Sequence, residues 1–195
     1  MPSTTTFTVL DEAHQALRAA VADVPGDDWG LPTPCALWNV AQVLRHAAGD
    51  QLAYAAAMTG SGGPDENPFE PSAGRPDDPR DWLEAALGAA GAAWSAVTAG
   101  SEVPTPLPQG AMDADAAAAA AALDAAVHAW DIAVATGQPA PLTAALAARL
   151  MPVAASIVEL LRGYGAYAAA LPPQPGDEAD AALLRYLGRQ PGWTR

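Results

Sequence analysis

Two segments of the sequence place a histidine and a carboxylate one helical turn apart. Asp124 and His128 have i, i+4 spacing, which on a helix brings both side chains to one face with Cβ atoms about 6 Å apart. His46 and Asp50 repeat this spacing earlier in the chain, and Asp131 closely follows His128. Imidazole nitrogens and carboxylate oxygens bind divalent transition metals, with bonds of about 2.0 to 2.2 Å. The spacing therefore suggests a metal site shared by two helices.

The predicted metal ligands are His46, Asp124 and His128. Helical bundles build such sites from side chains of facing helices. Two neutral imidazoles and one carboxylate leave positions open for water or substrate, which is typical of a catalytic site. On spacing alone, however, a simpler interpretation is preferred: an ordinary ion pair on a helix surface, or a buried histidine hydrogen-bonded to its neighbour.

The elements that must position these residues are helical. Alanine-rich segments alternate with proline and glycine clusters, and no alternating strand pattern occurs, so the fold class is all-α. We expect a four-helix bundle with long connections and a short C-terminal helix. Helices are predicted at residues 8–24, from an Asn39 cap to Gly60, at 80–99, from Asp113 or Asp115 to Gly137, at 143–171 with a kink or restart at Pro152, and in the terminal run DEADAALLRYLG.

Residues 61–79 form a long polar connection, rich in proline, between two of these helices. Its composition excludes regular structure, and its length exceeds that of most connections. Loops of this size are often functional or mobile, so we expect it to cover a substrate.

The charge of the chain restricts its partners. Nine basic residues against 22 acidic ones give a net charge of −13, which disfavours nucleic acid and anionic membranes. A single cysteine, Cys35, suits a reducing cytosol, and no basic residue precedes Arg18, which argues against a secretory signal. No membrane span is expected. We predict one domain over residues 1–195, located in the cytoplasm, monomeric or homodimeric, with a small-molecule substrate.

Three runs of the sequence carry a resemblance to a known family. They are TPCALWNVAQVLRH at 33–46, VHAWDIAVATG at 127–137 and LLRYLGRQP at 183–191. Together and in this order they resemble signatures of the mycothiol-dependent maleylpyruvate isomerase N-terminal domain family, which belongs to the DinB-like superfamily.

The resemblance implies a DinB-like four-helix bundle that holds a divalent metal through three side chains. The family's first histidine matches His46, and its Glu-x-x-x-His element falls on Asp124 and His128. Aspartate stands where glutamate is usual, which could shift the metal, change its coordination or mark a member without the ion. The isomerase also carries a C-terminal domain for which this chain has no room.

Two functions follow as hypotheses. The first is a metal-dependent enzyme of the thiol-transferase or isomerase type, in which the metal activates a small thiol, or water, against an electrophilic substrate. Zinc is the default ion, ferrous iron and nickel also suit the ligands, and mycothiol is implied by the resemblance alone. No proton carrier can be named. The alternative is a non-catalytic bundle that binds a small molecule or a partner, with a vestigial metal site.

Other candidate residues have an ordinary structural interpretation beside a functional one. Cys35 could be a nucleophile or a ligand, but a small buried apolar residue is the preferred interpretation. Asp50 and Asp131 could orient His46 and His128, or serve as cap or ion-pair partners.

The remaining candidates contribute less. His14 lies on an amphipathic helix and is predicted to face solvent, whereas Trp38 and Trp130 are predicted core anchors that could line a pocket. Arginines that could hold an anionic substrate are Arg45, Arg149 and Arg162, although each could equally balance surface carboxylates.

Overall fold

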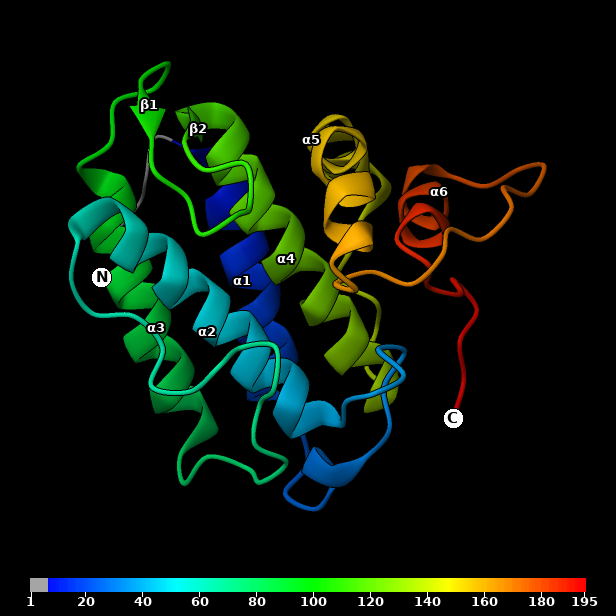
Figure 1. Cartoon of the computed structure of the whole chain (residues 1–195). Coiled ribbons are helices and arrows are strands. Elements are labelled where there is room, and N and C mark those ends of the chain that lie inside the picture. The colour runs from blue at the N-terminus through cyan, green and yellow to red at the C-terminus, as the bar shows by residue number, and fades with distance from the viewer. Residues whose placement is uncertain (1–6) are drawn as a thin grey trace.

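The computed structural model describes residues 7–195, and within them the protein is all-α (Figure 1). The α-helices are α1 (Thr8–Ala22), α2 (Val40–Thr59), α3 (Pro79–Ser95), α4 (Ala114–Ala135), α5 (Ala144–Gly163) and α6 (Ala179–Tyr186). A 3₁₀ turn, η1 (Asp28–Gly30), and two short antiparallel strands, β1 (Glu102–Val103) and β2 (Met112–Asp113), lie in the connections.

The bounds of α2 follow from its capping residues. The Asn39 side chain accepts a hydrogen bond from the Gln42 backbone N–H, and the Gln42 side chain accepts one from the Asn39 backbone N–H. This capping box satisfies two donors that the first turn of a helix leaves unpaired. Gly60 then ends the helix at φ 73°, in the left-handed region that glycine adopts without strain. The predicted Asn39 and Gly60 limits are confirmed.

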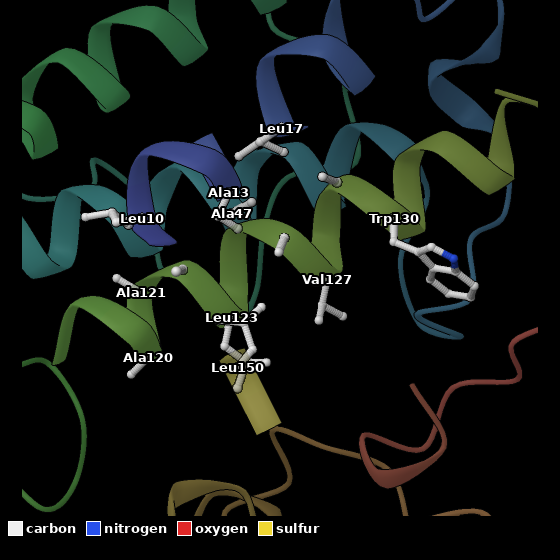
Figure 2. Packing of buried hydrophobic residues seen from close by; sticks show 14 of the residues in the cluster. Leu10, Ala13, Leu17, Ala47, Ala120, Ala121, Leu123, Val127, Trp130 and Leu150 are labelled. Carbon is white, nitrogen blue, oxygen red and sulfur yellow. The ribbon is translucent and has the colours of Figure 1, made fainter. Parts of the chain in front are cut away.

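Helices α1 to α4 form the bundle, α5 packs on the side of α4 away from α3, and α6 packs on α5 (Figure 1). Helix α4 is buried around nearly its whole circumference, because most of its residues are alanine and its neighbours approach closely. In Figure 2, Leu10 and Leu17 of α1 and Ala47 of α2 lie on one side of α4, and Leu150 of α5 lies on another. Polar side chains in such a helix are costly unless paired, so Asp124, His128 and Asp131 require partners.

Two predictions about the helices need correction. Helix α5 runs without a break through Pro152 and ends at Gly163, well before the predicted limit at residue 171. One proline removes a single backbone hydrogen bond, and here the buried face that packs on α4 holds the helix together. Helix α3 ends at Ser95 rather than Ala99, because the chain turns there toward β1.

Helices α4 and α5 are long and apolar enough to span a membrane by length and composition. This is weak evidence of a membrane protein, because core helices of globular proteins pass the same test, and 83% of the apolar window of α4 is buried inside the fold.

Candidate metal centre

The side chains of His46, Asp124 and His128 converge at one point between α2 and α4. His46 Nε2 and His128 Nε2 each lie 3.3 Å from Asp124 Oδ1, and the potential ligand atoms are all within 4.8 Å of one another. Both histidines are buried, and the Asp124 side chain is 11% exposed. Three groups that sequence spacing predicted as partners are therefore neighbours.

The separation of each histidine Nε2 from Asp124 Oδ1, 3.3 Å, is compatible with a shared metal ion, while the three atoms together span up to 4.8 Å. Charge-assisted N–H to carboxylate bonds are typically about 2.7 to 2.9 Å long. In a tetrahedral site with bonds of about 2.0 to 2.1 Å, two ligand atoms lie about 3.3 to 3.4 Å apart. Asp124 Oδ2 is buried, and among residues 7–195 it has no hydrogen-bond partner. A buried carboxylate oxygen without a partner is costly, and a bound cation would satisfy it.

His46 is oriented by the loop that follows α2. Its Nδ1 lies 2.8 Å from the Pro68 carbonyl oxygen, and since a carbonyl can only accept, Nδ1 carries the proton. Nε2 is thereby left to face Asp124. Two aromatic rings contact the imidazole: Trp38, with ring centroids 4.6 Å apart, and Phe69, at 5.6 Å. The 61–79 connection is thus folded over α2, and it supplies a contact to the site.

His128 is oriented from within the core. Its Nδ1 lies 2.9 Å from Asp131 Oδ2, one turn further along α4, and Asp131 is held in turn by Arg189. Burial alone would raise the pKa of Asp131, but the Arg189 charge and the hydrogen bonds from both neighbours lower it overall. Asp131 is therefore an ionised acceptor, and Nδ1 of His128 is the donor.

The charges of the cluster shift the pKa values of its members. For Asp124, burial is outweighed by the two histidines, and the pKa lies well below its usual value. Burial acts to lower the pKa of His128, yet Asp124 and Asp131 raise it to about 9. Burial, together with the negative charge of Asp124, raises the pKa of Asp50 to about 6. In the metal-free protein, a proton on His128 thus stabilises the Asp124 carboxylate.

The other candidates are placed as follows. Asp131 orients His128 as one interpretation foresaw, but His46 takes the Pro68 carbonyl, so Asp50 does not orient it. Burial raises the pKa of Cys35 to about 11, which disfavours a thiolate and supports the structural interpretation.

The prediction that His14 faces solvent is wrong. His14 is 4% exposed, and its Nε2 lies 2.8 Å from the side-chain oxygen of Gln51, a buried residue of α2. A polar partner across the helix interface allows an imidazole to be buried on the inner face of α1. Trp130 is a buried core residue as expected, whereas Trp38 is half-buried against His46.

The three arginines considered as anion-binding candidates each have a carboxylate partner, as the alternative interpretation allowed. Arg45 pairs with Glu66, Arg149 with Glu12 and Arg162 with Glu159.

Two supports of the site were missed from the sequence: Pro68, which holds His46, and Arg189, which holds Asp131. Pro68 contributes a backbone oxygen, which leaves no residue-type signal. Arg189 lies in the quoted LGRQP run, so its position was visible, but spacing could not link it to Asp131.

A model of the mycothiol maleylpyruvate isomerase N-terminal domain matches residues 10–133. The chain belongs to this family. Relatives in two strains of Mycobacterium tuberculosis, described as uncharacterized proteins, are 33% identical over 184 residues, which cover 91% of this chain and 93% of theirs. The three candidate ligands and Asp131 lie inside the matched family domain, whereas α5, α6 and Arg189 lie beyond it.

One solved structure shares the fold. It is a histidine-to-alanine mutant of mycothiol-dependent maleylpyruvate isomerase, with a TM-score of 0.50 and 18% sequence identity. The match covers 65% of this chain and 58% of that one. The likeness shows that the two proteins share the bundle architecture. The rest of the isomerase chain lies outside the match.

Proposed function

We propose that the protein binds one divalent metal ion through His46 Nε2, His128 Nε2 and the Asp124 carboxylate. The observation that supports this most strongly is the arrangement of the three groups: both Nδ1 atoms already have acceptors, so both Nε2 atoms are turned toward the same carboxylate oxygen at 3.3 Å. The shorter aspartate still reaches both imidazoles. The loss of one methylene at residue 124 is therefore weak support for a vestigial site.

The proposed activity is that of a metal-dependent enzyme of the thiol-transferase or isomerase type. Bound at three protein ligands, a metal supplies an open position at which a thiol or water loses its proton readily. The chain's own residues hold the two Nε2 atoms and the carboxylate in place and, through Trp38 and Phe69, exclude water from one face of His46.

A small thiol is the proposed co-substrate, because the family and the matched structure are both named for mycothiol. Cys35 is an unsuitable nucleophile at its raised pKa, so the sulfur would come from the bound thiol rather than from the protein. Zinc is the proposed ion, with ferrous iron and nickel suited to the same ligands. We also propose a cytoplasmic location, because a reducing compartment keeps a small thiol in its reduced form.

Phe69 indicates the side from which a substrate would approach. Its ring is 58% exposed although it contacts His46, so this edge of the site lies next to solvent. We therefore propose that the electrophile binds beneath the 61–79 connection.

Metal analysis of protein purified without chelator tests the metal site. We expect close to one ion per chain, lost in His46→Ala. The matched control is His14→Gln, which alters another buried histidine and should retain the ion. Absence of metal, even after loading with zinc, iron or nickel, would refute the proposal.

A second measurement tests the thiol chemistry separately. The metal-loaded protein should accelerate the reaction of a small thiol with an electrophile, and the chelated protein should not. No acceleration with any small thiol, in a protein that holds its metal, would remove the thiol reaction and leave the metal site standing.

A further inference from the structure

The support of His128 depends on the C-terminal part of the chain. Arg189 follows α6 and is 8% exposed, and it reaches Asp131 on α4, which is fully buried. The two residues are 58 positions apart in the sequence. A side chain distant in sequence thus contacts the residue that holds a proposed metal ligand.

The contact between Arg189 and Asp131 fixes both carboxylate oxygens. Nε lies 3.0 Å from Oδ1, and Nη2 lies 2.8 Å from Oδ2. The same Oδ2 accepts the hydrogen bond from His128 Nδ1. A guanidinium donates from a rigid fork that matches a carboxylate, which the single ammonium of lysine cannot reproduce. The plane of the Asp131 carboxylate is therefore set by Arg189.

The chain around Arg189 is itself closely docked. Gly188 has φ +81°, and a Cβ added there would lie 2.8 Å from Ala168 Cβ and 2.9 Å from the Ala169 carbonyl oxygen. The backbone N–H of Leu171 donates to the Arg185 carbonyl oxygen at 2.8 Å. Only glycine fits this contact. The C-terminal tail, residues 185–195, is therefore packed on residues 168–171 after α5, and this packing determines where Arg189 lies.

We propose that Arg189 is a positioning residue of the metal site, acting through Asp131 to keep His128 Nε2 turned toward Asp124. The inference rests on the proposed metal-binding function. It assigns a role in the site to a residue outside the matched family domain, which ends at residue 133.

The expected size of the effect follows from the chemistry of metal-bound imidazoles. Acceptors that orient such a ring typically change metal affinity by about 10- to 100-fold when they are lost. Without Arg189, Asp131 would be a buried carboxylate with one partner fewer, and its plane would no longer be fixed. We therefore expect Arg189→Gln to weaken zinc binding by about 10- to 100-fold.

Zinc affinity is measured by competition with a chromophoric chelator. The matched control is Arg185→Gln on the same tail, which removes an ion pair with Asp177 instead of one with Asp131. We expect this control to bind zinc as the wild type does. Equal weakening in both variants would overturn the proposal, because the tail would then act only by docking.

A second readout needs no metal. In nitrogen NMR spectra of the metal-free wild type, the His128 Nδ1 proton should be protected from exchange by its bond to Asp131. The proton should become exchangeable in Arg189→Gln and remain protected in Arg185→Gln. A proton that stays protected in Arg189→Gln, with zinc affinity unchanged, would overturn the proposal. A wild type with the protected proton but no zinc binding would refute the proposed function and support the orientation of His128.

Loss of Arg189 alone leaves a buried negative charge, which can prevent folding. The paired change Asp131→Asn with Arg189→Gln removes both charges, and we expect it to fold and still bind zinc more weakly. Circular dichroism verifies folding of each variant. Wild-type zinc affinity in the folded paired variant would also overturn the proposal.

Discussion

The two histidines of the site are held by different kinds of support. His46 donates to a backbone carbonyl of a surface connection, beside a largely exposed phenylalanine. His128 donates to an ionised carboxylate that is fully buried and paired with a buried arginine. The first support is neutral and depends on the path of a loop, whereas the second is charged and depends on two particular side chains.

Because the two supports differ, the two halves of the site should respond differently to substitutions. A backbone carbonyl persists through almost any substitution in the loop, so the His46 side is sensitive mainly to displacement of the chain. A buried ion pair is lost entirely when one partner is removed, and the remaining charge is then costly. Substitutions on the His128 side should therefore have the larger effects.

The largest effect is expected at Asp124, because its carboxylate is shared by both halves. Asp124→Asn keeps the size of the side chain but removes the negative charge, so zinc affinity should fall by more than about 100-fold, beyond the loss expected for an orienting residue. Competition with a chelator measures this. Asp115→Asn at the exposed start of α4 is the control and should bind normally.

The next effect concerns stability of the metal-free protein. Arg189→Ala leaves Asp131 buried without its cation, and should lower the free energy of unfolding by about 3 to 5 kcal/mol. Arg149→Ala breaks the exposed pair with Glu12 and should cost about 1 kcal/mol or less. Urea denaturation compares the two, and equal losses would contradict the distinction between buried and exposed support.

The pH dependence of the free energy of unfolding reports on the raised pKa of His128. Its folded pKa of about 9 exceeds the unfolded value of about 6.5, so its contribution is fully present below about pH 6.5 and is lost as the pH rises through 9. The free energy of unfolding of metal-free protein should fall by up to about 3 kcal/mol between about pH 7 and 9.5. The shifted pKa of Asp50, about 6, lies below this window.

The control for this measurement is His128→Asn, whose unfolding free energy should change much less over the same pH range. A wild type whose stability is constant from neutral to alkaline pH would contradict the electrostatic description of the cluster.

The smallest effect is expected on the loop side. A Cβ at Gly49 would lie 3.2 Å from Pro68 Cγ, so Gly49→Ala should displace the loop slightly and weaken the His46 contact. Zinc affinity should fall by less than about 10-fold, at the lower limit for an orienting contact. Gly88→Ala in α3 meets no atom within 4 Å and should only stabilise its helix, by about 0.5 to 1 kcal/mol. If Gly49→Ala lowered zinc affinity more than Arg189→Gln does, the loop side of the site, rather than the His128 side, would be the more sensitive one.

Much of the architecture could be predicted because local chemistry determines it. Asn39 and Gly60 limit α2 through capping and a left-handed turn, and these signals are visible in the sequence. The end of α5 was placed too late, because alanine continues beyond Gly163 and composition alone does not reveal where the chain turns to meet α6.

The candidate site was predictable in part for a similar reason. Asp124 and His128 share a helix face by spacing alone, and His46, with its own carboxylate one turn away on a facing helix, was the third predicted ligand, which the family resemblance then matched. Pro68 and Arg189 could not be predicted as supports, because Pro68 acts through its backbone and Arg189 meets Asp131 only after α5 packs on α4 and α6 packs on α5. The burial of His14 was missed because its partner, Gln51, lies on another helix.

Anomalous diffraction from crystals grown with zinc would locate the ion. We expect one peak about 2.0 to 2.2 Å from His46 Nε2, His128 Nε2 and an Asp124 carboxylate oxygen. A peak elsewhere in the protein, or none at the convergence of these three side chains at saturating zinc, would contradict the proposed metal site.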